Sequence, residues 1–81
     1  MNVNYAGKQY ELIFGSDVDR DGVYLELSTT EGSNTEVLLY AFCSDANQGF
    51  TFSAFKDELP FDLVELFVAE ARKRLPPNEG R

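Results

Sequence analysis

The sequence predicts an α+β domain: a four-stranded antiparallel β-meander followed by one C-terminal amphipathic helix packed across one face (ββββα). Four segments before Pro60 carry strand signals, three by alternation and one as an apolar run, and short stretches rich in Gly, Asp, Asn and Ser separate these segments. An apolar stripe with helical spacing follows Pro60. At 81 residues we expect a single domain over residues 1–75 and a flexible tail at 76–81.

The first two strands are predicted at residues 9–14 and 23–28. Both alternate apolar and polar side chains, with Tyr10, Leu12 and Phe14 on one side of the first strand and Val23, Leu25 and Leu27 on one side of the second. Residues 3–5 either extend the first strand or form a short edge piece, because residues 6–8 fit a bend or a turn.

The third and fourth strands are predicted at residues 36–43 and 50–55. The third is apolar on both faces, with Val37, Leu39, Ala41 and Cys43 on one side and Leu38, Tyr40 and Phe42 on the other. A strand of this kind is covered on both sides or meets a partner. The fourth strand again alternates, with Phe50 and Phe52 opposite Thr51 and Ser53.

The helix is predicted between Pro60, which suits a first turn, and the Pro76-Pro77 pair, which ends it. Acidic residues stand at its start and basic residues at its end, as the helix dipole favours. The predicted core stripe consists of Phe61, Val64, Phe67, Val68, Ala71 and Leu75. A second strip, Leu59, Leu63 and Leu66, is expected to point away from the core, which indicates more apolar surface than one helix covers.

Charge and composition restrict the function. The net charge of −7 at pH 7 repels phosphate backbones and anionic headgroups, so we expect neither nucleic-acid binding nor membrane binding. The sequence has no basic start followed by an apolar run and no apolar stretch of about 18 residues, so we expect no signal peptide and no transmembrane helix. Its single cysteine, Cys43, argues against a disulfide framework. These features predict a cytoplasmic protein.

Catalysis is not expected. The chain contains no histidine, so a Cys-His nucleophile and a zinc site built from several Cys or His ligands are both impossible. Cys43 ends an apolar strand and is interpreted as a small core residue. No carboxylate pair stands in an apolar setting that would raise the pKa of one member.

Residues 17–22 begin like the calcium loop D-x-[DN]-x-[DN]-G-x₅-E, with Asp17, Asp19 and Asp21 as candidate ligands and Gly22 at the turn. Position twelve, where a bidentate glutamate belongs, is Ser28. The alternative is an acidic hairpin, because Asp-Gly is a favoured turn pair and close carboxylates in water repel by under roughly 1 kcal/mol per pair. We therefore expect no obligatory cofactor and keep weak Ca²⁺ binding as an alternative.

The meander predicts that its first and third loops lie at the same end of the sheet. Asp45 and Asn47 would then share an edge with the three aspartates and supply further oxygen ligands. Calcium and a plain turn remain the two interpretations of this edge.

The function that we expect is a small non-enzymatic protein–protein interaction module. The predicted contact surface combines one sheet face with one side of the helix: Tyr24, Leu38, Tyr40, Phe42, Leu63 and Leu66. If the helix covers that sheet face instead, Leu25 and Leu39 are exposed. Aromatic anchors among acidic residues favour a basic protein partner, and a second copy of the chain is the other candidate. An acidic, antitoxin-like inhibitor that occupies a basic cleft is a further alternative.

Overall fold

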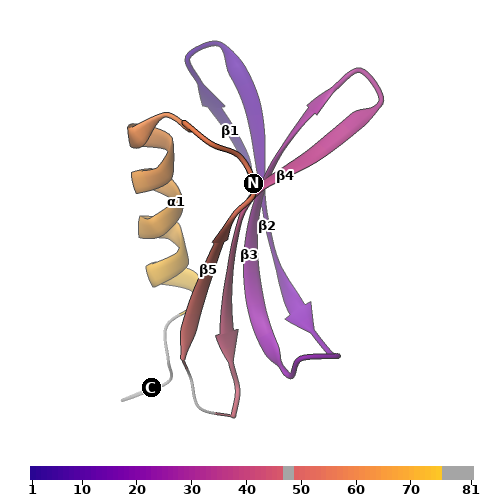
Figure 1. Cartoon of the computed structure of the whole chain (residues 1–81), viewed down its shortest axis with the longest axis vertical. Coiled ribbons are helices and arrows are strands. Elements are labelled where there is room, and N and C mark those ends of the chain that lie inside the picture. The colour runs from indigo at the N-terminus through magenta and orange to yellow at the C-terminus, as the bar shows by residue number, and fades with distance from the viewer. Residues whose placement is uncertain (47–48, 76–81) are drawn as a thin grey trace.

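The structure is a computed structural model that describes residues 1–46 and 49–75. Five antiparallel strands form one sheet in the order β1-β2-β3-β4-β5, and a helix follows them (Figure 1). The elements are β1 (Asn2–Tyr5), β2 (Lys8–Asp17), β3 (Gly22–Glu31), β4 (Asn34–Ser44), β5 (Phe50–Ala54) and α1 (Phe61–Arg74). The predicted α+β class and antiparallel meander are confirmed. The predicted tail at 76–81 lies outside the described residues.

The prediction of four strands is wrong, because β1 is a separate strand. Tyr5 pairs with Lys8 across a two-residue turn, and both turn residues have positive φ, +52° at Ala6 and +78° at Gly7. Two such residues match the twist of a tight hairpin. Alanine seldom adopts positive φ, so only Gly7 of the two turn residues is of a type that predicts this turn.

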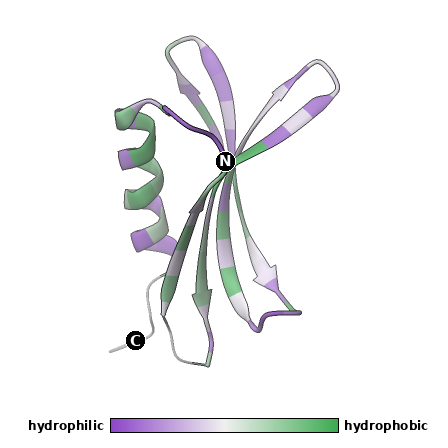
Figure 2. Ribbon diagram, in the orientation of Figure 1, coloured by the Kyte–Doolittle hydropathy of each residue, from purple (hydrophilic) through white to green (hydrophobic). Residues whose placement is uncertain are grey.

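The hairpins are longer, and their loops shorter, than predicted. β3 and β4 stay paired from Gly22 and Ser44 out to Glu31 and Asn34, where Gly32 turns the chain with φ +62°. In Figure 1 the β1–β2 and β3–β4 hairpins diverge at one end of the sheet, as strand twist requires. The turn residues there sit beyond the apolar core, and Figure 2 shows those hairpin ends as more hydrophilic than the sheet beside the helix.

A β-bulge in β4 alters which side chains of this strand face the helix. Leu27 pairs with Leu39, but the next residue, Ser28, pairs with Val37, so Leu38 is the extra residue. Leu38 and Leu39 are both buried in the core. The prediction that Leu38 shares the exposed face of Tyr40 is therefore wrong, because it assumed uninterrupted alternation.

The helix begins after Pro60, as predicted, with Asp62 in its first turn and three basic residues in its last. Its core stripe differs from the prediction: Leu63, Phe67 and Ala71 are buried, whereas Phe61 is 74% exposed and Val68 is 36% exposed. The predicted core stripe and the strip of Leu59, Leu63 and Leu66 are neighbours on the helical wheel. The positions of the apolar residues alone do not show which of the two faces the sheet. Within the described residues, no helix has the length and apolar character needed to cross a membrane.

The helix covers the sheet face that carries Leu25, Leu27 and Leu39. These leucines meet the helix side chains in one core, and Figure 2 shows the apolar residues concentrated on α1 and the strands beside it. The core consists of Val3, Tyr10, Leu12, Leu25, Leu27, Leu38, Leu39, Ala41, Cys43, Leu63, Phe67, Ala71 and Leu75. The opposite face of the sheet, which we call the open face, is not covered by the helix that the structure describes.

Candidate functional site

Three aromatic side chains from β3 and β4 lie together on the open face. Tyr24 and Phe42 are directly paired across the two strands, and Tyr40 is the diagonal neighbour of Tyr24. The rings of Tyr24 and Tyr40 are stacked, with centroids 5.4 Å apart and an interplanar angle of 19°. Tyr24, Tyr40 and Phe42, which we call the aromatic cluster, therefore lie side by side on this face, as the alternation in these strands predicts. Tyr24 and Tyr40 are half-buried, whereas Phe42 is buried, so the predicted contact surface is reduced here to the two tyrosines.

Two glycines provide the space for this cluster. A Cβ atom on Gly15 would lie 2.9 Å from the hydroxyl oxygen of Tyr24, and one on Gly22 would lie 2.5 Å from Cζ of Phe42. Any larger residue at either position would displace the ring above it. The rings therefore lie directly over the backbone of neighbouring strands.

The β2–β3 loop folds back onto the aromatic cluster. The guanidinium carbon of Arg20 is 3.9 Å from the centroid of the Phe42 ring, a cation–π contact. The Tyr40 hydroxyl donates a hydrogen bond to Oδ2 of Asp17 at 3.3 Å. Burial, and next the negative charge of Asp17, raise the pKa of Tyr40 above its ordinary value. The cluster thus has charged groups fixed at its edge.

Two of the three aspartates, Asp17 and Asp21, make hydrogen bonds that hold the turn. Oδ1 of Asp17 accepts hydrogen bonds from the backbone N–H groups of Asp19 and Arg20, both at 3.2 Å. Such side-chain-to-backbone bonds stabilise local turns. Asp21 has φ +55°, and its carbonyl oxygen accepts the N–H of Asp45 at 2.9 Å.

The predicted shared edge between the two loops is therefore present at Asp21 and Asp45, whereas Asn47 lies outside the described residues. In the described part of the chain, no three or more Asp, Glu, Cys or His side chains form a group that could hold a metal ion. Asp17, Asp19 and Asp21 are therefore no such group, and weak calcium binding stays a prediction.

The helical half of the predicted contact surface is not where we expected it. Leu63 is fully buried, and Leu66 is partly buried against the core. Moreover, α1 covers the face opposite the aromatic cluster, so no surface combines Tyr24 and Tyr40 with this helix. Leu38, Leu63 and Leu66 therefore do not belong to the exposed site.

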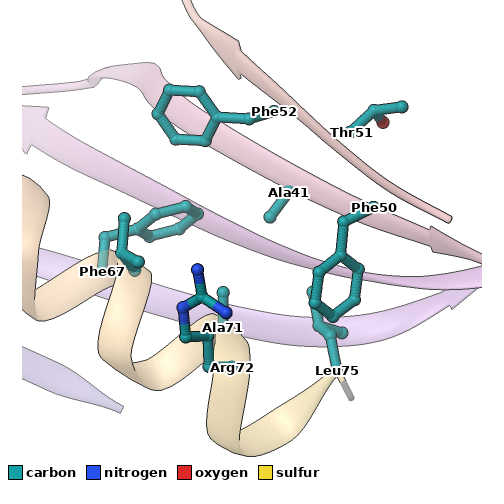
Figure 3. A pocket seen from close by; sticks show the side chains of 9 residues that line it. Ala41, Phe50, Thr51, Phe52, Phe67, Ala71, Arg72 and Leu75 are labelled. Carbon is teal, nitrogen blue, oxygen red and sulfur yellow. The ribbon is translucent and has the colours of Figure 1, made fainter. Parts of the chain in front are cut away.

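Sequence reasoning missed a second apolar surface, at the edge of the sheet. A groove of about 190 Å³ runs between β5 and α1 (Figure 3). It is lined by Ala41, Phe50, Thr51, Phe52, Phe67, Val68, Ala71, Arg72 and Leu75. The signal was present in the predicted core stripe, because that stripe includes Phe61 and Val68, which α1 leaves exposed.

Most of the positive charge is neutralised locally. Glutamates hold four of the basic side chains in ion pairs: Lys8 with Glu31, Lys56 with Glu36, and both Lys73 and Arg74 with Glu70. Arg20 lies on Phe42. Among the described residues, most acidic side chains have no such partner, so the surface of this part of the chain is predominantly negative.

Comparison with known proteins gives no precedent for either surface. No protein-family model, no curated protein and no solved structure matches the chain. Its function is therefore inferred from the two surfaces described above, the aromatic cluster on the open face and the groove at β5.

Proposed function

We propose that the protein is a non-enzymatic docking module whose aromatic cluster binds a basic segment of another protein. The observation that carries this proposal is the stacked pair Tyr24–Tyr40 on an uncovered sheet face, bordered by carboxylates. Asp17 is bonded to the Tyr40 hydroxyl, and Glu26 is the cross-strand partner of Tyr40 on the same face.

The chemistry of this surface suits an arginine or lysine side chain. Tyrosine contributes large contact area with few rotatable bonds, which is why it is frequent among the residues that dominate binding energy. A cation over a tyrosine ring gains roughly 0.5–2 kcal/mol, depending on its exposure. The adjacent carboxylates of Asp17 and Glu26 would accept hydrogen bonds from the same cation.

The overall charge supports the same class of partner. A net charge of −7 attracts a basic segment over a longer range and raises the association rate at low salt. Because this attraction is screened within about 8 Å at physiological ionic strength, binding should weaken as salt is added. The aromatic contacts, in contrast, do not depend on salt.

The test compares proteins captured from a lysate of the native cell. The bait is wild type, the double variant Tyr24→Ser/Tyr40→Ser, or Phe14→Ser as a control that removes an exposed aromatic ring from the other sheet face. We expect a basic protein to be retained by wild type and by the control, to be lost with the double variant, and to be retained less strongly at moderate salt. Equal capture by a correctly folded double variant would refute the proposal.

A further inference from the structure

We infer that two copies of this chain associate through β5 and the adjacent flank of α1, extending the sheet across a two-fold axis. This inference uses a different surface from the aromatic cluster and does not rest on the proposed docking function. Three properties of the surface support a second copy as its occupant: a free strand edge, a set of exposed apolar side chains, and a charge pattern that complements itself.

Among the described strands, none pairs with the outer edge of β5. β5 is the last strand of the sheet, and the Phe55 N–H just beyond it donates to the Leu38 carbonyl at 2.9 Å. Hydrogen bonding alternates along an antiparallel strand, so the N–H and C=O groups of Phe50, Phe52 and Ala54 point away from β4. The strand contains no charge and no proline, which are the usual devices that block pairing of an edge.

The sequence of β5 pairs well with itself. In an antiparallel pair centred on Phe52, the Phe52 rings of the two copies are neighbours, and each Phe50 lies opposite Ala54. A large side chain thus meets a small one on either side of the axis. This is the self-complementary arrangement that a two-fold interface requires.

The exposed apolar area is suitable for a dimer. Phe50 is 43% exposed, Phe52 52% and Phe61 74%, and Val68 adds a smaller contribution. At about 150–250 Å² for a phenylalanine, these three rings alone offer roughly 350 Å² per copy. A stable interface buries about 800 Å² per partner, so the rings supply close to half, and the strand backbone and polar rim can provide the rest.

The flank of α1 beside the groove carries complementary charges. At 100° per residue, Phe61, Glu65, Val68 and Arg72 lie within about 60° of one another on the helix. Val68 and Arg72 line the groove, where Figure 3 shows the Arg72 side chain extending from α1 between the helix and β5. Within the described residues, Arg72 forms no ion pair, although its neighbours Lys73 and Arg74 both bind Glu70.

A two-fold axis pairs these charges. Two helices that run antiparallel and meet near Val68 place Glu65 of one copy opposite Arg72 of the other, and the symmetry repeats the pair. Pairing of β5 with its copy also places the two helices antiparallel on the same side of the extended sheet. Because Phe52 and Val68 line the same groove, one two-fold axis beside Phe52 serves both the strand pair and the charge pairs.

The principal experiment is a charge exchange followed by sedimentation velocity over a range of protein concentrations at physiological salt. We expect wild type to form a dimer. Glu65→Arg and Arg72→Glu each place like charges together twice per dimer, so each should weaken association by about tenfold or more. The double exchange, Glu65→Arg/Arg72→Glu, should restore association towards that of wild type.

A second variant tests the strand edge without disturbing the rest of the fold. Ala54→Pro removes an N–H that points to the free edge, a position where proline is tolerated in a strand. We expect a monomer with the circular dichroism of wild type. A wild type that remains monomeric at hundreds of micromolar overturns the inference, and so does a dimer that Ala54→Pro and both single charge variants leave intact.

Discussion

The hydroxyl group of Tyr40 in β4 donates a hydrogen bond to Asp17, 23 residues earlier at the end of β2, with an O···O distance of 3.3 Å. The other oxygen of the same carboxylate holds the backbone of Asp19 and Arg20. Asp17 therefore joins the turn of the loop to the aromatic cluster. This contact links the acidic loop to the surface that we propose for docking.

The first prediction concerns the ionisation of Tyr40. Burial, the charge of Asp17 and the hydrogen bond all disfavour the phenolate, and they raise the pKa of Tyr40. Asp17→Asn removes the charge, so the Tyr40 pKa should fall toward the ordinary value for tyrosine. Ultraviolet difference titration of Asp17→Asn and wild type, each with and without Tyr40→Phe, isolates this transition.

The same shift sets a pH window for stability. A phenol whose pKa is higher in the folded state contributes stability that is complete below about pH 10 and is lost as pH rises through the folded value. Wild type should therefore lose stability above pH 10 more steeply than Asp17→Asn. Asp19→Asn is the control, because Asp19 is not among the groups that shift the pKa of Tyr40. An equal effect of both substitutions would contradict the assignment.

The second prediction concerns Gly22, over which the Phe42 ring lies. A Cβ at this position would meet the backbone carbonyl oxygen of Cys43 as well as the ring, and the backbone cannot move aside without breaking the pairing of β3 with β4. We expect Gly22→Ala to lower the free energy of unfolding by about 3 kcal/mol, the upper end for overpacking.

The matched control is Gly7→Ala, measured by urea denaturation alongside Gly22→Ala. Gly7 has φ +78°, but no atom lies within 4 Å of the position that an added methyl group would take, so only the backbone penalty of about 1–2 kcal/mol applies. If both variants lose the same stability, close packing at Gly22 is not the reason for the glycine.

The third prediction concerns Glu70 on the helix surface. A hydrogen bond from Nε of Arg74 at 3.0 Å, with Lys73 nearby, lowers the pKa of this carboxyl group. A carboxylate with a lowered folded-state pKa contributes stability above about pH 4.3, and this is lost as pH falls through the folded value. Glu70→Gln should cost under about 1 kcal/mol at neutral pH, as expected for a surface pair, and nothing in strong acid.

Urea denaturation at neutral pH and in acid, with Glu11→Gln as a control whose carboxylate has no ion pair among the described residues, measures this difference. A cost for Glu70→Gln that persists unchanged at low pH would mean that the charge of Glu70 is not responsible.

Much of the fold could be predicted because it depends on local patterns. Alternation in β3 and β4 placed Tyr24, Tyr40 and Phe42 on one face, and the meander placed Asp21 and Asp45 at one end of the sheet. Both results need only the period of a strand and the order of the elements.

The remaining errors depend on tertiary contacts. The bulge at Leu38 shifts the alternation in β4 by one residue, and no residue type announces it. The turn at Ala6 uses positive φ without the usual residue, and the sheet pairing compensates for it. These details determine which leucines are buried, and they moved Leu38 from the predicted site into the core.

The error with the largest consequence concerns the rotation of α1 about its axis, which decides the side of the helix that faces the sheet. The final prediction tests the rotation that the structure shows. Leu63 is fully buried, so Leu63→Ala should lower the free energy of unfolding by about 2–5 kcal/mol. Phe61 is 74% exposed, and Phe61→Ala should change it by no more than about 0.5 kcal/mol. Urea denaturation in dilute solution, where self-association does not contribute, compares the two. If Phe61→Ala lost more stability than Leu63→Ala, the predicted core stripe would be right. The exposed flank of α1 on which the dimer depends would then not exist.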